Sequence, residues 1–328
     1  MGLRFFKIKD LIRYVDNKEK IWIKFISFLR INNRDISEII SRTPKITSMK
    51  IIIHGGFFSE SDQSHEVKTA KQNSLKEIAE KAFQYLQTHS AFDSVAYAVS
   101  LLEDDPLYNA GIGSQIQSDG VIRMSAAIMN GETQKLSGVI NIQDVKNPIF
   151  VAKDLIGEDD RVLGGQGAKR YATEHGFENF STEIPQRRKE YETKLNNGGK
   201  GTVGCVAIDK DGKLAAATST GGKGFEIPGR ISDSATVAGN YANTFCAVSC
   251  TGVGEDIVSN ATATKIVTRV TDGMSLETAF SKTFDELKTI DGFAGAIAID
   301  KNGNIYHQNS YPTMVFASFD GEKFDIFS

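Results

Sequence analysis

The sequence predicts an α+β protein in which strands and helices are grouped along the chain. Two hairpins of similar sequence support this, because residues 203–214 (VGCVAIDKDGKL) are echoed by residues 294–305 (AGAIAIDKNGNI). Each contains apolar stretches on either side of Asp-Gly or Asn-Gly, the common two-residue hairpin turns. Residues 256–270 and 275–287, which lie between the hairpins, have the apolar spacing of helices. Strands at both ends with helices between them favour sheets covered by helices.

One strand and two helices are expected nearer the N-terminus. Residues 50–54 (KIIIH) are an apolar run followed by two glycines, so we expect a buried strand that runs into a tight turn. The Ser-x-x-Glu sequence that begins at Ser74 has the spacing of a capping box and predicts the start of a helix. A second helix is expected from about Phe92 to a stop before Pro106, because proline cannot continue a helix.

Residues 178–200 are expected to form an exposed, flexible segment. They are polar and charged and end in Asn-Asn-Gly-Gly-Lys, a composition that cannot bury a core. The pattern changes abruptly after them, because residues 202–209 (TVGCVAID) and 213–220 (KLAAATST) read as strands. The bond between Gly201 and Thr202 therefore joins a flexible segment to a buried strand.

Length and composition are those of an ordinary globular protein. The chain has 328 residues, of which 40% are hydrophobic and 24% charged, enough for one large domain or two small ones. Its net charge of −3 argues against a general nucleic-acid binder, which needs a basic excess to neutralise phosphates. Three cysteines without zinc-like spacing are expected to be buried and reduced. No stretch is apolar and long enough to span a membrane.

The first 48 residues differ from the rest in charge. They carry a net charge of +6, which leaves −9 for the remainder. Lys24 interrupts an apolar run at residues 21–29 and no small-residue cleavage site follows, so we reject a secretory signal. Three interpretations stay open: a helix that binds a membrane surface or a partner, a targeting extension, and an artefact of too early a start codon. Met49, directly before a predicted strand, favours the artefact.

Common catalytic patterns are missing. The five histidines are scattered without HExxH, no GxSxG elbow is present, and the glycine clusters at 111–113 and 164–167 lack a Walker lysine. We expect those glycines to supply positive φ angles instead. A Ser-His-Asp triad stays open, because its members need not be neighbours in sequence.

Gly201-Thr202 could supply a nucleophile of another kind. A threonine hydroxyl needs a base, and a threonine that begins a chain can use its own α-amine, whose pKa is about 8. Exposing that amine requires cleavage of the bond before Thr202. Gly201 has no side chain to hinder the approach of the hydroxyl to its carbonyl. An isolated Gly-Thr pair would more often just begin a strand, so the surrounding motifs decide.

Seven motifs accompany this pair in a fixed order over about residues 50–320. They are His54-Gly55-Gly56, LLEDDPLYNAGIG (101–113), GTVGCVAID (201–209), TSTGG (218–222), Pro228-Gly229-Arg230, Ser232-Asp233-Ser234 and VSCTGVG (248–254). Together they are far more specific than any one alone. The chain resembles the plant-type asparaginase and isoaspartyl peptidase family of N-terminal-nucleophile hydrolases.

The resemblance implies a self-processing hydrolase of L-asparagine and β-aspartyl (isoaspartyl) dipeptides. Thr202 would be the nucleophile, released by cleavage after Gly201, and would form a β-aspartyl ester. Thr220 would orient the Thr202 hydroxyl. Thr251 and Gly252 would form the oxyanion hole through a hydroxyl and a backbone N–H.

The resemblance also implies how substrate is held. Arg230 would clamp the α-carboxylate with its forked guanidinium, and Asp233 would bind the α-ammonium. Gly252 would also contact the substrate, and Asn109 would support the site. Taken singly, an ion pair explains Arg230 equally well, and capping of a loop explains Asp233.

By the same resemblance the fold is a four-layer αββα sandwich. An α chain of residues 49–201 and a β chain of residues 202–328 would form one domain, and two such αβ units would pair. No cofactor is required and no nucleic-acid or membrane partner is implied; we expect a cytoplasmic enzyme. A structural sodium ion is implied on the backbone carbonyls of Leu102, Glu103, Asp105, Tyr108, Ala110 and Ile112.

Three departures from the family pattern bear on the leaving group and on the rate of self-cleavage. Ser125 stands where an acidic residue is frequent, Lys223-Gly224-Phe225 where Met-Thr-Asn is common, and Phe57-Phe58 where Ala-Gly is usual. Two enzyme alternatives, a glycosylasparaginase and a protein-cleaving threonine aspartase, are disfavoured by Gly201, since glycosylasparaginases typically have Asp there. A catalytically silent relative that acts as a binding protein is the alternative from another class.

Overall fold

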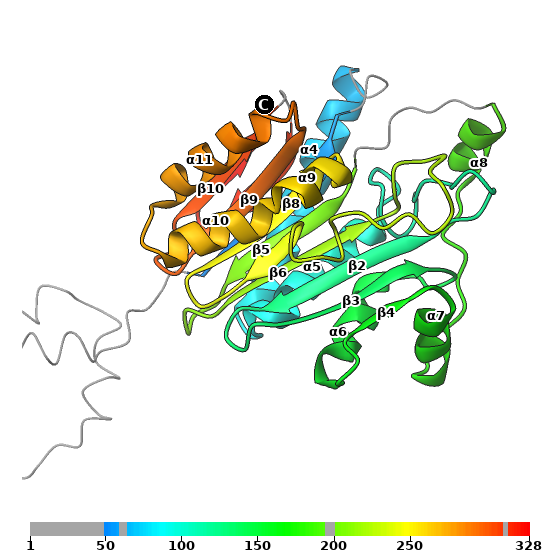
Figure 1. Ribbon diagram of the computed structural model, residues 1–328, viewed down its shortest axis with the longest axis horizontal. Coiled ribbons are helices and arrows are strands. Elements are labelled where there is room, and N and C mark those ends of the chain that lie inside the picture. The colour runs from blue at the N-terminus through cyan, green and yellow to red at the C-terminus, as the bar shows by residue number, and fades with distance from the viewer. Residues whose placement is uncertain (1–48, 59–63, 194–200, 311–313) are drawn as a thin grey trace, which may run out of the picture. The chain divides into compact units, whose positions relative to one another are not determined.

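The larger of two sheets contains β1, the strand predicted near the N-terminus. The computed structural model describes residues 49–58, 64–193, 201–310 and 314–328; the predicted extension 1–48 and residues 194–200 of the predicted flexible segment lie outside them. Within these residues the larger sheet has the strand order β12-β11-β1-β5-β6-β2-β3-β4 (Figure 1). Its strands are β1 (Lys50–Phe57), β2 (Met124–Asn130), β3 (Lys135–Ile142), β4 (Val162–Gly164), β5 (Val203–Ile208), β6 (Leu214–Thr220), β11 (Met314–Phe319) and β12 (Phe324–Ile326).

Strand β1 lies in the middle of this sheet and is buried along most of its length. It pairs antiparallel with β11 on one side and with β5 on the other. The two glycines do not form the predicted turn, because the strand continues through them to Phe57 with a shift in register between His54 and Phe57. Gly56 takes φ +87°, and a Cβ on Gly55 would lie 2.4 Å from Cε1 of Tyr108. The glycines therefore permit a bulge and a close ring contact.

The smaller sheet has the order β10-β9-β8-β7 and contains the second predicted hairpin. Its strands are β7 (Asn240–Ala242), β8 (Cys246–Gly252), β9 (Ala294–Asp300) and β10 (Ile305–Asn309). Strand β8 packs against β5 and β6, so the two sheets face each other. Ala, Val and Ile dominate these inner strands, and most of their residues are buried. Strands covered on both faces are expected to be apolar throughout.

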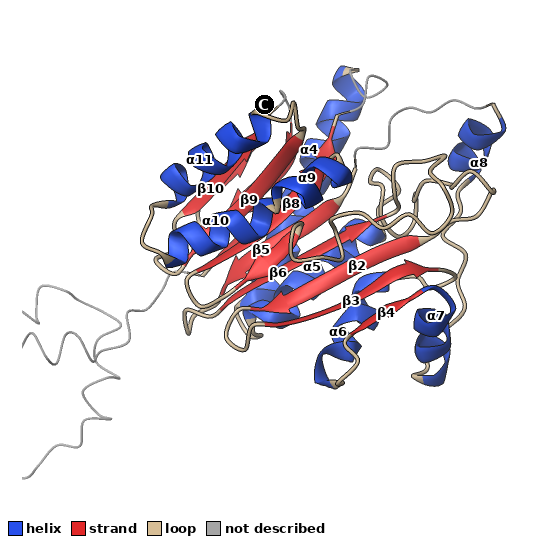
Figure 2. Ribbon diagram, viewed as in Figure 1, coloured by secondary structure: helices blue, strands red, loops and turns tan. Residues whose placement is uncertain are grey.

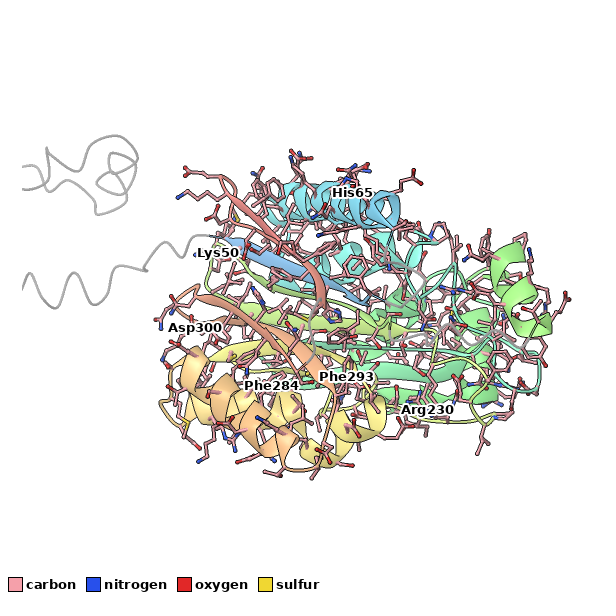
Figure 3. The ribbon with its side chains drawn as sticks, turned by 90° about the horizontal axis from the view of Figure 1, so that it is seen from above. Lys50, His65, Arg230, Phe284, Phe293 and Asp300 are labelled. Atoms are coloured by element: carbon pink, nitrogen blue, oxygen red, sulfur yellow. The ribbon has the colours of Figure 1, made fainter. Side chains whose placement is uncertain are left out.

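Helices cover the outer face of each sheet. On the larger sheet α4 (His65–Leu86) contacts β1 and β11, α5 (Ala91–Glu103) contacts β5 and β6, α6 (Pro148–Asp154) contacts β2 and β3, and α7 (Gly165–Glu174) contacts β3. On the smaller sheet α10 (Thr262–Thr271) contacts β7 and β8, and α11 (Leu276–Lys288) contacts β10. Figure 2 separates helices from strands by colour, and the view from above in Figure 3 shows helices on both sides of the strands. The protein combines sheets with covering helices, which agrees with the predicted α+β class at this coarse level.

The helix predicted from Ser74 begins nine residues earlier. Helix α4 starts at His65, and the hydroxyl of Ser64 caps it by accepting the Val67 N–H. Ser74 lies inside the helix, where its hydroxyl donates to the Asp105 carboxylate at 2.5 Å. The prediction from the Ser-x-x-Glu spacing that a helix starts at Ser74 is therefore wrong. The expected second helix is confirmed as α5, which ends at Glu103 before Pro106.

The single helix expected at residues 256–270 is two helices. Helix α9 (Gly254–Asn260) is followed by Ala261, which takes a left-handed conformation with φ +51°, and α10 begins at the next residue. Ala261 N–H donates to the Val258 carbonyl as the chain changes direction. Helix α11 agrees with the prediction, and Ser275 caps its start.

Part of the predicted flexible segment is a helix, α8 (Pro185–Glu192). Arg187 Nε donates to the Gly113 carbonyl at 2.8 Å, and the ring of Tyr191 stacks on Phe225 with centroids 5.5 Å apart. Composition did not predict this helix, because polar and aromatic contacts hold it and not burial of an apolar face.

Several smaller expectations are confirmed. Cys205, Cys246 and Cys250 are buried and form no disulfide. The expected positive φ is found at Gly111, Gly113 and Gly165, but it is wrong for Gly164, which is extended with φ −121°, and for Gly167, which lies inside α7. A short 3₁₀ helix, η3 (Leu155–Gly157), follows α6. Of the helices in the described ranges, none has the length and apolarity to cross a membrane.

Candidate active site

The hairpin β5–β6 places Thr202 beside Thr220. Its register pairs Val203, the first residue of β5, with Ser219. Thr202, just before β5, therefore lies opposite Thr220, the last residue of β6. Thr202 Oγ1 donates to Thr220 Oγ1 at 3.3 Å, and both residues are buried. Thr220 Oγ1 in turn accepts the Gly222 N–H at 3.1 Å. A turn readable in the sequence thus brings together the predicted nucleophile and the hydroxyl predicted to orient it.

Thr202 is also held through its backbone, by a contact that sequence reasoning missed. Its carbonyl lies 3.0 Å from Nδ1 of His54 on β1. Nε2 of His54 lies 2.9 Å from the Ser249 hydroxyl on β8. Burial lowers the pKa of His54 to about 3, although the Thr202 carbonyl opposes this shift. In the sequence, His54 stood out only as part of the His-Gly-Gly motif, which did not indicate a role for the imidazole ring.

Thr251 and Gly252, the predicted oxyanion hole, lie at the end of β8. The Thr251 hydroxyl is fully buried and has no hydrogen-bond partner among the described residues. Gly252 takes φ +137°, and a Cβ there would lie 2.5 Å from the Phe293 carbonyl oxygen. Only glycine fits this bend, at which β8 ends and the next N–H, of Val253, donates to the Phe293 carbonyl.

Arg230 and Asp233 meet at the start of α9. A Cβ on Gly254 would lie 3.0 Å from Arg230 Nη2 and 2.9 Å from Asp233 Oδ1, so this glycine leaves room for both side chains. Figure 3 labels Arg230 in the loop that precedes the smaller sheet. Arg230 forms a bidentate ion pair with Glu255, with Nε–Oε1 at 2.7 Å and Nη2–Oε2 at 2.8 Å. The predicted carboxylate clamp therefore has a carboxylate partner within this chain.

The ion pair with Arg230 and burial shift the pKa values of Glu255 and Asp233 in opposite directions. The hydrogen bond from Arg230 lowers the pKa of Glu255 to about 2. Burial raises the pKa of Asp233 to about 7, although the Arg230 charge opposes this shift. Asp233 Oδ2 is buried and has no hydrogen-bond partner in the described part of the chain. A cation placed beside this oxygen would favour the ionised carboxylate.

Asn109, predicted to support the site, contacts both Gly201 and the segment that follows β6. Its Nδ2 donates to the Gly222 carbonyl at 2.5 Å, and its own carbonyl accepts the Gly221 N–H at 2.8 Å. A Cβ on Gly201 would lie only 2.9 Å from the Cβ of Asn109. The missing side chain of Gly201 is therefore required by packing against Asn109.

Strand β8 connects the two halves of the site. On the nucleophile side, the Ser249 hydroxyl contacts His54 and lies 2.7 Å from Thr218 Oγ1. On the side of Arg230 and Asp233, the Cys250 N–H donates to the Gly239 carbonyl, and a Cβ on Gly239 would lie 2.4 Å from Asp233 Oδ2. Thr251 follows directly along the strand.

The loop predicted to hold sodium turns back on itself. The Glu103 carbonyl accepts the Ile112 N–H at 2.7 Å, and the Asp105 carbonyl accepts the Tyr108 N–H at 3.1 Å. Positive φ at Gly111 and Gly113 closes the turn, and Cβ atoms there would lie 2.3 Å from the Glu103 carbonyl oxygen and 2.8 Å from that of Tyr108. These crowded carbonyls suit a hard cation in ligand type. No group of three or more His, Cys, Asp or Glu side chains within the described ranges could hold a metal.

The Glu103 side chain is a second feature that sequence reasoning missed. Its Oε1 accepts from the Ser219 hydroxyl at 2.6 Å and from the Ile149 N–H at 3.1 Å. Burial raises its pKa to about 8 against these hydrogen bonds. Ser219 precedes Thr220 on β6, so an uncommon buried carboxyl group lies behind the predicted site. A lone Glu at the end of a helix gives no warning of this.

Each departure from the family pattern has a defined environment. Ser125 pairs with Thr220 across β2 and β6, and its hydroxyl accepts the Asn141 N–H. Lys223 Nζ lies 3.7 Å from Glu255. Phe57 packs against Phe293 with ring centroids 4.5 Å apart.

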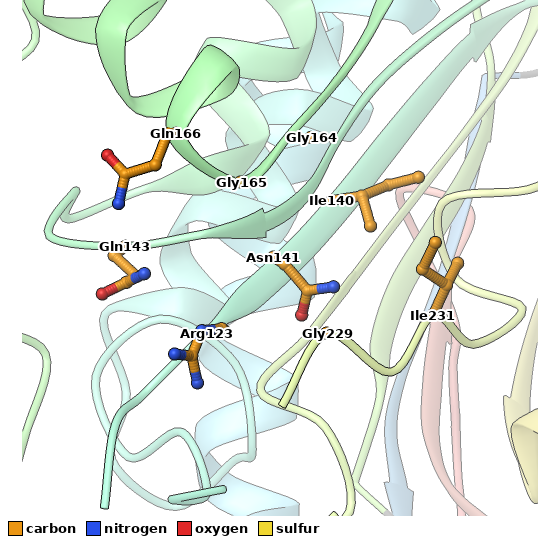
Figure 4. Close-up of a pocket in the computed structure, with 9 residues that line it drawn as sticks. All are labelled: Arg123, Ile140, Asn141, Gln143, Gly164, Gly165, Gln166, Gly229 and Ile231. Carbon is orange, nitrogen blue, oxygen red and sulfur yellow. The ribbon is translucent and has the colours of Figure 1, made fainter. Parts of the chain in front are cut away.

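A pocket of about 360 Å³ lies next to the Arg230 loop (Figure 4). It is lined by Arg123, Ile140, Asn141, Gln143, Gly164, Gly165, Gln166, Gly229 and Ile231. Gly229 and Ile231 flank Arg230 in sequence, and Asn141 Nδ2 donates to the Arg230 carbonyl at 3.2 Å. None of the predicted catalytic residues lines this pocket, so we do not assign it to the site.

Comparisons with known proteins find a matching family model and similar sequences. A family model described as asparaginase matches residues 47–197 and 181–327. An isoaspartyl peptidase/L-asparaginase of Nostoc sp. is 43% identical over 84% of this chain and 92% of its own length. The isoaspartyl peptidase of Escherichia coli is 37% identical over 78% of this chain and 88% of its own length. A plant-type L-asparaginase of Pyrococcus furiosus is 34% identical over 81% of this chain and 95% of its own length.

Proposed function

Because the chain belongs to the asparaginase family, which includes isoaspartyl peptidases and plant-type L-asparaginases, we propose that it hydrolyses L-asparagine and β-aspartyl dipeptides after cutting itself before Thr202. Two buried atoms carry the proposal: the Thr251 hydroxyl and Asp233 Oδ2, neither of which has a hydrogen-bond partner among the residues that the structure describes. A buried polar atom without a partner costs about 1–3 kcal/mol. A ligand with an oxyanion and an ammonium group would satisfy both.

The proposed fold is the four-layer αββα sandwich of N-terminal-nucleophile hydrolases. The contacts of α4–α7 with the larger sheet, of α10 and α11 with the smaller sheet, and between the sheets support it. Cleavage would divide the chain into an α chain of residues 49–201 and a β chain of residues 202–328. Thr202 would then begin the β chain just before β5.

Self-cleavage would begin with attack of Thr202 Oγ1 on the Gly201 carbonyl carbon. The C–N bond of that peptide breaks as the ester forms, the Thr202 amine takes up the hydroxyl proton, and water then hydrolyses the ester. Thr220, 3.3 Å from the attacking oxygen, would hold the hydroxyl in position. The Gly201–Asn109 contact would hold the peptide bond that is cut.

Substrate hydrolysis would use the same hydroxyl with the freed amine as base. The amine takes the proton from Oγ1, which attacks the side-chain amide carbon of the substrate. Thr251 and the Gly252 N–H would stabilise the oxyanion, and donors of this kind each contribute about 3 kcal/mol. The leaving group, ammonia from L-asparagine or the free amino acid from a β-aspartyl dipeptide, takes the proton from the Thr202 amine and departs. Water then hydrolyses the β-aspartyl ester to release aspartate.

Arg230 and Asp233 would select the free α-amino acid end of the substrate. Asp233, once ionised, would pair with the α-ammonium group. Arg230 would bind the α-carboxylate with its remaining N–H groups or by displacing Glu255. Lys223 beside Glu255 adds positive charge to this end of the site.

We propose that the reaction requires no cofactor. Three further predictions concern the rest of the protein: sodium at the loop 102–112, pairing of two αβ units and a cytoplasmic location. Ile227 and Ile231, exposed by 80% and 58% on the loop that contains Arg230, support a surface that another subunit covers. Light scattering of the cleaved protein would measure the assembly directly.

The test is the mass and N-terminal sequence of the purified protein after long incubation, with Thr202→Ala alongside. We expect two fragments, one beginning at Thr202, and an uncut variant. Only the cleaved protein should release ammonia from L-asparagine and the free amino acid from a β-aspartyl dipeptide. An uncut wild-type chain, or an equally active Thr202→Ala protein, would contradict the proposal.

A further inference from the structure

The carbonyl of Thr202 has an unusual partner for the start of a strand. Pairing between β5 and β1 ends at Gly204 opposite His54, so Thr202 lies beyond the last paired residue. The His54 ring binds the Thr202 carbonyl in place of a backbone N–H of the neighbouring strand. The contact is buried and bridges 148 positions in sequence.

The direction of the hydrogen bonds follows from the carbonyl. A carbonyl oxygen only accepts, so Nδ1 of His54 must carry the proton. In a neutral ring Nε2 then accepts, and its donor is the Ser249 hydroxyl at 2.9 Å. The Ser249 oxygen can therefore accept from Thr218 Oγ1 at 2.7 Å. One continuous chain of hydrogen bonds runs from Thr218 to the backbone of Thr202.

Gly204 makes room for this chain of contacts. A Cβ on Gly204 would lie 2.0 Å from the Ser249 hydroxyl oxygen and 2.4 Å from Nε2 of His54. Any side chain at position 204 would displace the ring or the serine. The ring and the serine therefore fill the space between the two sheets that this glycine leaves open.

We propose that His54, oriented by Ser249, is a positioning residue that anchors Thr202 by its carbonyl, an inference that rests on the proposed function. Before cleavage, Thr202 is fixed on both sides by the chain. After cleavage the Gly201 side is lost, and the new N-terminal residue keeps its link to Val203, the Thr220 contact and the His54 contact. Fixing the carbonyl restricts the Thr202 backbone, and with it the direction of both the amine and the hydroxyl.

Substitutions at His54 separate the hydrogen bond from packing. His54→Leu fills similar space without a donor, whereas the amide N–H of His54→Asn can replace Nδ1. We expect His54→Leu to lower kcat for L-asparagine about tenfold with KM little changed, because a tenfold loss equals about 1.4 kcal/mol, within the range of one neutral hydrogen bond. His54→Asn should recover most of the loss. Equal loss in both variants, or a wild-type kcat in His54→Leu, would overturn the proposal.

A double-mutant cycle tests whether Ser249 acts through His54. Ser249→Ala should lower kcat by a smaller factor, and adding it to His54→Leu should cause no further loss. Additive losses would mean that the serine acts on its own and would contradict the proposed link. Ser137→Ala, which removes another buried strand hydroxyl, bonded to the Ala152 carbonyl, and His307→Asn on β10 are the matched controls.

The tautomer of His54 gives a readout that does not depend on turnover. In ¹⁵N-histidine-labelled wild-type protein, His54 should be neutral with the proton on Nδ1, and Ser249→Ala should reduce the population of this tautomer. A proton on Nε2 in the wild type would overturn the proposal even if His54→Leu failed to fold. An uncut and inactive wild type would instead refute the proposed function, and this inference would be lost with it.

Discussion

Asp233 has a buried carboxylate oxygen, beside the Arg230 guanidinium, that finds no hydrogen-bond partner within the described part of the chain. Its pKa, raised to about 7 by burial, means that the free enzyme loses this proton as the pH rises through neutrality. The ionised form is the one that would bind an ammonium group. Arg230 and Glu255 are the charged groups that face it, and Glu255 is held ionised by Arg230.

Asp233→Asn should therefore raise KM for L-asparagine by about 10- to 100-fold, the loss expected for a hydrogen bond between charged groups. In the wild type, KM should fall as the pH increases from about 6 to about 8, and this dependence should disappear in Asp233→Asn. Steady-state kinetics across this range provide the measurement. Asp209→Asn, another buried aspartate that accepts backbone N–H groups in the β5–β6 turn, is the control and should keep the wild-type KM.

Glu103 predicts a dependence of stability on pH. Its pKa rises from 4.5 to about 8 on folding, so between these values the folded protein holds more protons than the unfolded chain. The free energy of unfolding must then fall as the pH rises through this window. Glu103→Gln cannot ionise, so denaturant unfolding of the Thr202→Ala protein should show a smaller fall with this substitution. The difference should be on the order of a few kcal/mol, and an identical fall in both proteins would contradict the prediction.

The junction between α9 and α10 is the element whose backbone predicts a stabilising change. Ala261 holds φ +51° between the two helices, a conformation that costs an L-residue about 1–2 kcal/mol and glycine very little. Ala261→Gly should therefore increase the free energy of unfolding by about 1 kcal/mol, measured by urea titration of the uncut Thr202→Ala protein.

The matched control has the opposite sign. Ala279→Gly, inside α11, should lower the free energy of unfolding by about 1 kcal/mol or more, because glycine is a poor helix residue. A loss of stability in Ala261→Gly as well would show that the left-handed turn is not a source of strain.

Across the whole molecule, the proposed α and β chains share one sheet. Strand β1 of the α chain lies between β11 and β5 of the β chain, and β2 pairs with β6. Separating the chains would break these backbone hydrogen bonds and expose the apolar core around β1. After cleavage we therefore expect both fragments to co-elute in size-exclusion chromatography and to separate only in denaturant. A free fragment of residues 202–328 in native buffer would contradict this.

The sequence by itself determined much of the local structure and the predicted set of site residues. Asp-Gly and Asn-Gly turns between apolar strands predicted both hairpins, and the register of the first places Thr202 opposite Thr220. Local signals suffice there because turn geometry sets register within a hairpin. The start of α4, the break at Ala261 and helix α8 were not predicted, because a cap, a left-handed residue and contacts with distant loops decide them.

Only the tertiary structure decided which distant segments meet at Thr202. Strand order places His54 of β1 beside the Thr202 carbonyl, and the approach of the second sheet brings Ser249 to the same ring. The tertiary structure also pairs Arg230 with Glu255 and buries Glu103 behind Ser219. Such contacts depend on how sheets and loops pack, which no local propensity or turn specifies. The sequence thus determined the residue types and spacing of the site, and packing of the two sheets determined their partners and their pKa values.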